Sequence, residues 1–232
     1  MVTIYTITYN EELLIQFMID HYRERFPGCK IVVYDNISTD NTVEIALANS
    51  CEVVPYNTNN RLQDYRYTEI KNSCWKDAKT DWVLMCDLDE LLDISTRLLK
   101  TEEASGTSMI KTRNYDMVAL DDRLDIAGIK YGERSKGMGK SCLFNKKLIS
   151  EINYDNGCHF CNPVGKVVYS RRAYKLYHYC YPNYGLTVRR YKLYRSRISP
   201  EEIKNGCSLY DETPEEVRAL YTEARRKAVK AR

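Results

Sequence analysis

The stretch WVLMCDLDE, residues 82–90, joins an apolar run to a group of acidic side chains. Residues 82–86 are apolar enough to predict a buried strand. Asp87 and Asp89 follow two residues apart, and on an extended segment such side chains leave on the same side, so we expect both carboxylates to face one ion. Mg²⁺ and Mn²⁺ prefer oxygen ligands. An acidic turn that caps the next helix is the alternative interpretation.

Strands and helices alternate on the N-terminal side of this stretch. The expected order is strand 2–8, helix 11–23, strand 30–34, a helix ending near residue 48, strand 51–55 and helix 64–78. The helices are recognised by apolar residues at helical spacing, and the strands by short β-rich runs. Such alternation predicts an α/β fold with a mostly parallel sheet flanked by helices.

Polar residues directly follow three of the expected strands. They are Thr8-Tyr9-Asn10, Asp35-Asn36 and Asp87-Leu88-Asp89. In open α/β sheets ligands bind beyond the carboxyl ends of the strands. We therefore expect these three clusters to converge on one rim of the sheet.

The C-terminal half has a weaker pattern. Residues 107–112, 141–145 and 164–169 predict strands, and glycines at 128, 132, 137 and 139 predict a mobile loop before Lys140. A helix is expected at 186–197. A second should open at the capping box Thr213-Pro214-Glu215-Glu216 and run toward Arg232. These elements predict a mixed C-terminal half with terminal helices.

Composition narrows the class of protein. The 232 residues are 44% hydrophobic and 29% charged, which suits a folded globular chain. A net charge of +3 with interspersed signs argues against a nucleic-acid partner. No apolar run approaches the roughly 20 residues that span a bilayer. Nine cysteines without framework spacing indicate a reducing compartment, so a cytoplasmic location is expected.

Three ordered motifs together resemble family 2-type glycosyltransferases of the GT-A (Rossmann-like) fold. They are YTITYNEE at 5–12, VYDNISTDNT at 33–42 and the stretch at 82–90, so the resemblance covers about the first 90 residues. The sequence is most similar to a small Asp-Leu-Asp-Glu branch that includes virus-encoded enzymes. The resemblance implies metal-dependent, inverting transfer from a nucleoside-diphosphate sugar, expected to be a UDP-sugar, to a hydroxyl of a glycan or glycoprotein.

The same resemblance implies a domain plan and a set of donor-site residues. One domain would span 1–232, with a nucleotide-binding half (1–90), an acceptor half (91–212) and a basic C-terminal helix (213–232). A further domain could follow this basic end. The expected nucleotide and sugar contacts are Thr8, Tyr9, Asn10, Glu11, Asp35, Arg61, Asp64 and Asp87. Asp87 would reach the ribose or a Mn²⁺ or Mg²⁺ ion, and Asp89 would be the principal metal ligand.

The catalytic base is the point at which the sequence departs from the family. Inverting members commonly carry it in a Glu-Asp pair, and no such pair follows Glu90. Asp155 is the candidate for deprotonating the acceptor hydroxyl, with Glu151 in reserve. His159 is the expected late histidine ligand, although His178 occupies a comparable position.

Lys140, after the glycine-rich stretch, could neutralise diphosphate oxygens or be a solvated surface cation. Two other classes of function remain open. One is a non-catalytic sugar-nucleotide-binding module of a larger protein. The other is a nucleotidyltransferase, which the acidic segment after the first strand disfavours because triphosphate sites use glycine- and lysine-rich loops.

Overall fold

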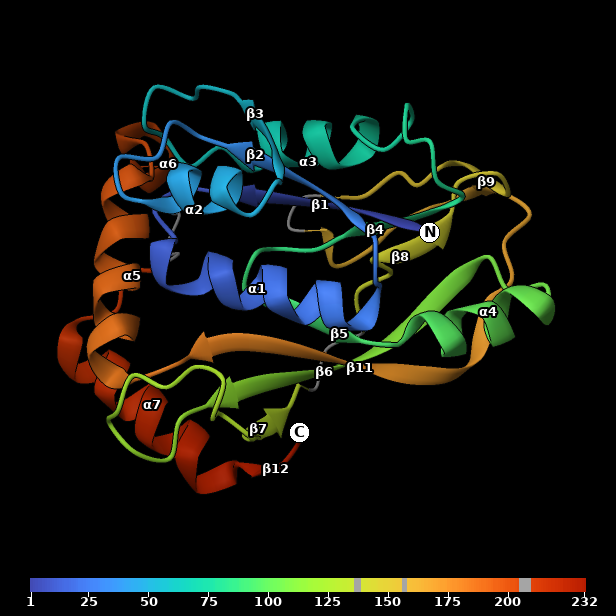
Figure 1. Ribbon diagram of the computed structural model, residues 1–232. Coiled ribbons are helices and arrows are strands. Elements are labelled where there is room, and N and C mark those ends of the chain that lie inside the picture. The colour runs from blue at the N-terminus through green and yellow to red at the C-terminus, as the bar shows by residue number, and fades with distance from the viewer. Residues whose placement is uncertain (136–138, 156–157, 205–209) are drawn as a thin grey trace. The chain divides into compact units, whose positions relative to one another are not determined.

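A computed structural model describes residues 1–135, 139–155, 158–204 and 210–232 of the chain (Figure 1). Residue contacts divide it into two compact units. Unit 1 comprises Met1–Tyr56, Asp64–Asn114 and Gly137–Tyr177, and unit 2 comprises Asn57–Gln63, Tyr115–Lys136 and His178–Arg232. Strands β6 (Met109–Val118) and β11 (Tyr169–Tyr181) each contribute residues to both units. These boundaries differ from the divisions expected at residues 90 and 212.

The core of unit 1 is a sheet with four neighbouring parallel strands. Their order is β3 (Glu52–Pro55), β2 (Lys30–Asp35), β1 (Val2–Thr8) and β4 (Trp82–Met85). Thr8 is opposite Asp35, and Tyr5 is opposite Met85, so the carboxyl ends of these strands lie at one edge. Strand β8 (Leu143–Asn145) extends the sheet antiparallel to β4, and β5 (Glu90–Asp93) pairs with β11.

Helices cover this sheet on both sides. They are α1 (Glu12–Arg25), α2 (Thr42–Ala48), α3 (Asp64–Ser73) and α4 (Thr96–Ala104). Figure 1 shows α1 and α3 on opposite sides of β1. The predicted α/β class, with a mostly parallel sheet flanked by helices, is confirmed.

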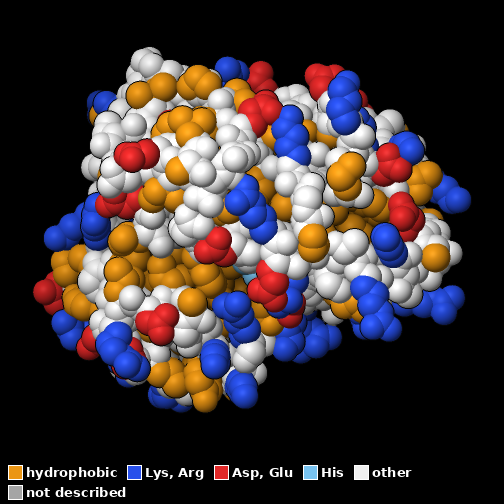
Figure 2. All heavy atoms as spheres, in the orientation of Figure 1, with side chains coloured by type: hydrophobic (Ala, Val, Ile, Leu, Met, Phe, Trp, Pro, Cys, Tyr) orange, Lys and Arg blue, Asp and Glu red, His pale blue; other side chains and the backbone are white. Residues whose placement is uncertain are grey.

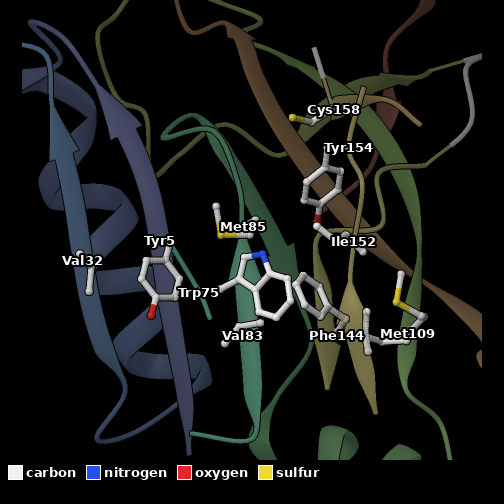
Figure 3. Packing of buried hydrophobic residues seen from close by; sticks show 11 residues of the cluster. Tyr5, Val32, Trp75, Val83, Met85, Met109, Phe144, Ile152, Tyr154 and Cys158 are labelled. Carbon is white, nitrogen blue, oxygen red and sulfur yellow. The ribbon is translucent and has the colours of Figure 1, made fainter. Parts of the chain in front are cut away.

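Side-chain alternation along the strands builds the core between the sheet and α3. Tyr5, Val83 and Met85 belong to one buried cluster, whose centre is Trp75, just beyond the end of α3 (Figure 3). The Trp75 and Phe144 rings pack edge to face, with centroids 5.0 Å apart. Aromatic pairs of this kind add to the free energy gained from burial alone.

A small hairpin completes unit 1. Strands β9 (Ile149–Glu151) and β10 (Val164–Gly165) are antiparallel, and an isolated bridge joins Tyr154 to Cys161. Asp155 and His159 lie in the segment that this bridge closes. Two residues of the segment, 156 and 157, fall outside the described part of the chain.

Unit 2 contains the terminal helices and a short antiparallel group of strands. Its elements are β7 (Tyr131–Arg134), α5 (Tyr184–Arg197), α6 (Pro200–Lys204), α7 (Pro214–Lys227) and β12 (Val229–Lys230), with the ends of β6 and β11. Val118, Tyr221 and Ala224 form a buried cluster, and the Tyr221 hydroxyl donates to Ala119 O at 3.0 Å. The capping box at Thr213 is present as predicted.

Three expectations for the C-terminal half were wrong. The last helix ends at Lys227, and β12 follows it. One strand was expected at 164–169, whereas β11 begins at Tyr169 and runs for 13 residues. Its exposed Arg and Lys side chains interrupt the apolar pattern by which strands are recognised. Gly132 lies within β7, where a Cβ atom would meet Asp116 O at 2.9 Å, so this glycine allows close strand approach. Gly137 lies outside the described residues.

Acidic and basic side chains are interspersed over the face drawn in Figure 2. This pattern agrees with the small net charge of +3. Among the helices that the structure describes, none combines the length and the apolar character needed to cross a bilayer.

Candidate functional site

The loops after β1 and β2 are joined by hydrogen bonds at the carboxyl edge of the sheet. The backbone N–H of Asn10 donates to Ser38 Oγ at 2.9 Å, and Thr39 N donates to Asn10 Oδ1 at 2.7 Å. Glu11 N donates to Thr42 Oγ1 at 2.8 Å. Asn10 has a left-handed backbone (φ 54°), a conformation that Asn tolerates better than most residues. The predicted convergence of these two polar clusters is therefore observed.

Asp35 is buried at the end of β2 and shapes the loop that follows. Its Oδ2 accepts from Ser38 N at 2.9 Å, and its Oδ1 accepts from the Ser38 hydroxyl at 2.5 Å. Asn36 N donates to Thr8 O at 3.0 Å, which continues the contact between the two strand ends. A nucleotide contact by Asp35 would thus use a carboxylate whose orientation Ser38 already holds.

The hydroxyl of Thr8 has no hydrogen-bond partner among the described residues, although Thr8 is only 4% exposed. Thr6, two residues earlier on the same face of β1, has the same property. Buried hydroxyls are nearly always satisfied in folded proteins. Thr8 Oγ1 is therefore a buried polar atom near this edge whose hydrogen-bonding capacity is unused among the described residues.

The acidic motif forms a tight turn between β4 and β5. Glu90 N donates to Asp87 O at 3.0 Å, and Leu88 is buried. The expectation of an extended segment was wrong, because the chain reverses here so that β5 can pair with β11. The two-residue alternation that would point Asp87 and Asp89 the same way does not apply within a turn.

Two buried lysines hold the Asp87 carboxylate. Lys71 Nζ lies 2.5 Å from Asp87 Oδ1, and Lys140 Nζ lies 2.7 Å from Asp87 Oδ2. Lys140 Nζ also lies 2.7 Å from Glu90 Oε1. The side chains of both lysines are 7% exposed, whereas that of Asp87 is 39% exposed. The four residues form a cluster of two ammonium groups and two carboxyl groups, which we call the lysine–carboxylate cluster.

The electrostatics of the cluster keep Asp87 and both lysines charged. Burial would raise the pKa of Asp87, but Lys140 and Lys71 more than offset this and hold the pKa well below its usual range. Burial would lower the pKa of each lysine, yet Asp87 raises both, with help from Glu90 at Lys140. Asp87 is therefore anionic and both lysines are cationic at neutral pH.

The turn that carries Asp155 lies near this cluster. Burial raises the pKa of the Cys158 thiol to about 11, and Lys71, Asp87, Lys140 and Asp155 all lie close enough to influence it. Asp155 is exposed, and its Oδ1 accepts from the backbone N–H of Phe160 at 3.0 Å. The structure thus brings the predicted base and the acidic motif into one region.

The other predicted residues occupy different positions. His159 is exposed in the same turn as Asp155, while Glu151 lies 2.7 Å from Lys76 Nζ in an ion pair. Asp64 is the first residue of α3. Arg61 belongs to unit 2, where its backbone carbonyl accepts a hydrogen bond from the Thr58 hydroxyl.

The site can be tested for its fit to Mg²⁺ or Mn²⁺. Both Asp87 oxygens already contact ammonium groups, and Glu90 Oε1 contacts Lys140. A direct metal bond to Asp87 would use the remaining lone pairs of its oxygens and would bring the ion close to the ammonium groups of Lys71 and Lys140. Asp89 is half-buried in the same turn, and sites for these ions commonly use only one or two carboxylates together with substrate phosphates. The carboxylates of Asp87 and Asp89 thus offer the oxygen ligands that these ions prefer, and repulsion from the two lysines would oppose a direct bond at Asp87.

Sequence reasoning missed Lys71 as a site residue. It stands on the apolar face expected for α3, between Ile70 and Cys74. A lysine on the buried face of a helix requires a buried partner, because an unpaired charge is costly there. The position of Lys71 on this face could have predicted a buried ion pair, but it did not identify Asp87 as the partner.

Comparison with known families supports the resemblance described for about the first 90 residues. Residues 3–104 match the model of a family described as Glycosyl transferase family 2. The match covers less than half of the chain and includes β1 to β4, the acidic turn and Lys71. No curated protein matches the sequence.

Several solved structures are similar to this chain at low sequence identity. S. aureus TarS has 15% identity and a TM-score of 0.49, covering 95% of this chain and 42% of TarS. S. aureus TarS 1-349 in complex with UDP has 17% identity and a TM-score of 0.49, covering 96% and 70% of the two chains. Glucosyl-3-phosphoglycerate synthase from Mycobacterium tuberculosis, in complex with Mn²⁺, UDP and glucosyl-3-phosphoglycerate, has 20% identity and a TM-score of 0.34, covering 49% and 43%. The chain thus spans less than half of TarS.

Proposed function

We propose that this chain is a metal-dependent glycosyltransferase that moves a sugar from a UDP-sugar to a hydroxyl of a glycan or glycoprotein, with inversion. One observation carries the proposal. The acidic turn and the joined loops after β1 and β2 occupy the carboxyl edge of a parallel sheet, in a segment that matches Glycosyl transferase family 2. Ligands of open α/β sheets bind at this edge.

The nucleoside would lie against the loops after β1 and β2. Thr8, Tyr9, Asn10 and Glu11 line the end of β1, and Asp35 lies directly opposite Thr8 in the neighbouring strand. Arg61 and Asp64 are proposed to contact the nucleotide or the sugar.

The diphosphate would lie at the acidic turn. Asp89 is the proposed principal ligand of Mn²⁺ or Mg²⁺, with His159 as a further ligand and Asp87 turned toward the ribose. The ion would neutralise charge on the departing diphosphate. Lys140 and Lys71 hold Asp87 in place and keep it ionised, so its carboxylate can accept a hydrogen bond from a ribose hydroxyl.

Asp155 is the proposed base that takes the proton from the acceptor hydroxyl. It is exposed and close to Cys158 and the lysine–carboxylate cluster, whereas Glu151 already pairs with Lys76. A base must come within hydrogen-bonding distance of the hydroxyl it deprotonates. An exposed carboxylate in a turn meets that requirement more readily than one held in an ion pair.

Calorimetric titration with UDP, with and without Mn²⁺, tests the donor site. Wild-type protein should bind UDP more tightly with Mn²⁺, and Asp89→Ala should remove that gain. The matched control is Asp81→Ala, an acidic surface residue paired with Lys147, and it should bind like wild type. Absence of UDP binding under both conditions would overturn the proposal.

Release of free sugar from UDP-sugars, or transfer to an acceptor, separates an enzyme from a binding module. An active wild type and an inactive Asp155→Asn protein that still binds UDP are expected. Binding of UDP-sugars by wild type without any turnover would instead indicate a non-catalytic sugar-nucleotide-binding module.

A further inference from the structure

Unit 2 contains a group of metal-ligand side chains separate from the acidic turn. Asp116 of β6 and His178 and Cys180 of β11 offer a carboxylate oxygen, an imidazole nitrogen and a sulfur that all lie within 4.8 Å of one another. All three side chains are half-buried. Among the residues that the structure describes, this is the one group of three such side chains at this spacing.

Strand geometry brings the three together. His178 and Cys180 are two residues apart on β11, so their side chains leave the same face. Strand β6 pairs with β11, and Ala119 N donates to Tyr181 O at 3.0 Å in this region. Cys180 Sγ also contacts Met117 O at 3.9 Å, which places the thiol beside β6. The arrangement therefore rests on two paired strands.

The distance between His178 and Asp116 suits a small tetrahedral ion. His178 Nδ1 lies 3.3 Å from Asp116 Oδ1. Two ligands bonded at about 2.0–2.1 Å to a tetrahedral zinc ion would be about 3.3 Å apart. The pair therefore already has a spacing at which one ion could bridge both atoms with little movement of the strands.

The ligand types select the class of ion. Thiolate and imidazole favour Zn²⁺ and similar transition metals, whereas Mg²⁺ prefers oxygen. We propose that Asp116, His178 and Cys180 form a Zn²⁺ site in unit 2, distinct from the Mn²⁺ or Mg²⁺ site proposed at Asp89. Three protein ligands leave a fourth position for water. On binding, the Cys180 thiol would lose its proton to solvent and coordinate as thiolate.

Residues of α5 and β7 lie next to the proposed zinc ligands. Tyr191 of α5 is close enough to Cys180 and His178 for both to influence the pKa of its phenol, which burial raises. Glu133 is opposite Asp116 in the β6–β7 pairing, but its carboxylate lies 3.8 Å from Lys227 Nζ. Bound zinc would link β6 to β11 and stabilise unit 2, because it binds only the folded arrangement.

Titration of the full chain with Co²⁺, followed by near-ultraviolet and visible absorption, tests the proposal. A thiolate-to-cobalt charge-transfer band should grow to one equivalent, and Zn²⁺ should abolish it by displacing Co²⁺. The Cys180→Ser protein should lack the band. The matched control is Cys29→Ser, because Cys29 is also half-buried and its Sγ contacts the Tyr22 carbonyl. This control should keep the band.

Conservative variants of the other two ligands distinguish weaker metal binding from loss of the fold. Asp116→Asn and His178→Gln should keep the thiolate band but weaken Co²⁺ affinity by about tenfold or more, and circular dichroism should show each variant folded. The proposal is overturned if folded wild type gives no thiolate band, or if Cys180→Ser retains it. Neither result depends on UDP binding, so the outcome is independent of the proposed transferase activity.

Discussion

The ammonium group of Lys140 lies 2.7 Å from the carboxylate of Asp87, a residue of the acidic turn. The two residues are 53 positions apart in the chain. Lys140 is almost fully buried, and its second carboxylate partner is Glu90. The buried lysine places a positive charge beside the turn and helps to keep the Asp87 carboxylate anionic.

Replacing Lys140 by methionine should destabilise the protein by about 3–5 kcal/mol, because Glu90 would be left as a buried carboxylate without its ion-pair partner. Urea unfolding measures this change. Lys147→Met is the control, since Lys147 forms a surface pair with Asp81 and should change stability by no more than about 0.5 kcal/mol. Equal stability of the two variants would show that the lysine–carboxylate cluster contributes nothing.

Acid should weaken the fold partly through Asp87. Its pKa is lowered in the folded protein, so the unfolded chain binds more protons in acid. The stabilisation is complete above the ordinary pKa of about 3.9 and is lost as the pH falls toward the folded value. Asp87→Asn should thus be less stable than wild type at pH 7, and the gap should narrow below about pH 4. Urea unfolding across this pH range measures the gap, and a constant gap would contradict the assignment.

Asp155→Asn should lower kcat by about 100- to 10,000-fold, as expected for loss of a general base, while UDP affinity stays near the wild-type value. Steady-state kinetics and calorimetry measure the two quantities separately. Glu151→Gln is the control, because Glu151 pairs with Lys76 and should retain activity. Loss of activity only in Glu151→Gln would move the role of base to that residue.

Tyr22→Phe should destabilise the protein by about 1–3 kcal/mol. The Tyr22 hydroxyl donates to Glu90 O at 2.9 Å and accepts from Leu92 N at 3.2 Å, and all three groups are buried. Phenylalanine would leave both backbone groups unsatisfied without creating a large cavity. Thermal unfolding measures the loss, and Tyr131→Phe, at an exposed position, is the control that should unfold like wild type.

Local patterns were sufficient for the N-terminal fold. Short apolar runs and helical spacing predicted β1 to β4 and α1 to α3 within a few residues, because each element has its own buried side. The same method placed the end of α3 at residue 78, whereas the helix ends at Ser73. It also missed most of β11, in which charged side chains point to solvent from a strand that neighbouring strands hold.

Sequence alone determined the succession of strands and helices along the N-terminal part of the chain. It also identified the polar residues at the carboxyl ends of the strands, because a strand's periodicity and its terminal residues are local properties. Only the tertiary structure decided that Lys71 and Lys140 occupy both oxygens of Asp87, and that Asp116 meets His178 and Cys180. Each of these contacts joins residues that lie far apart in the sequence. Charge pairing and ligand geometry depend on distances of a few ångströms, which chain folding sets and sequence spacing does not.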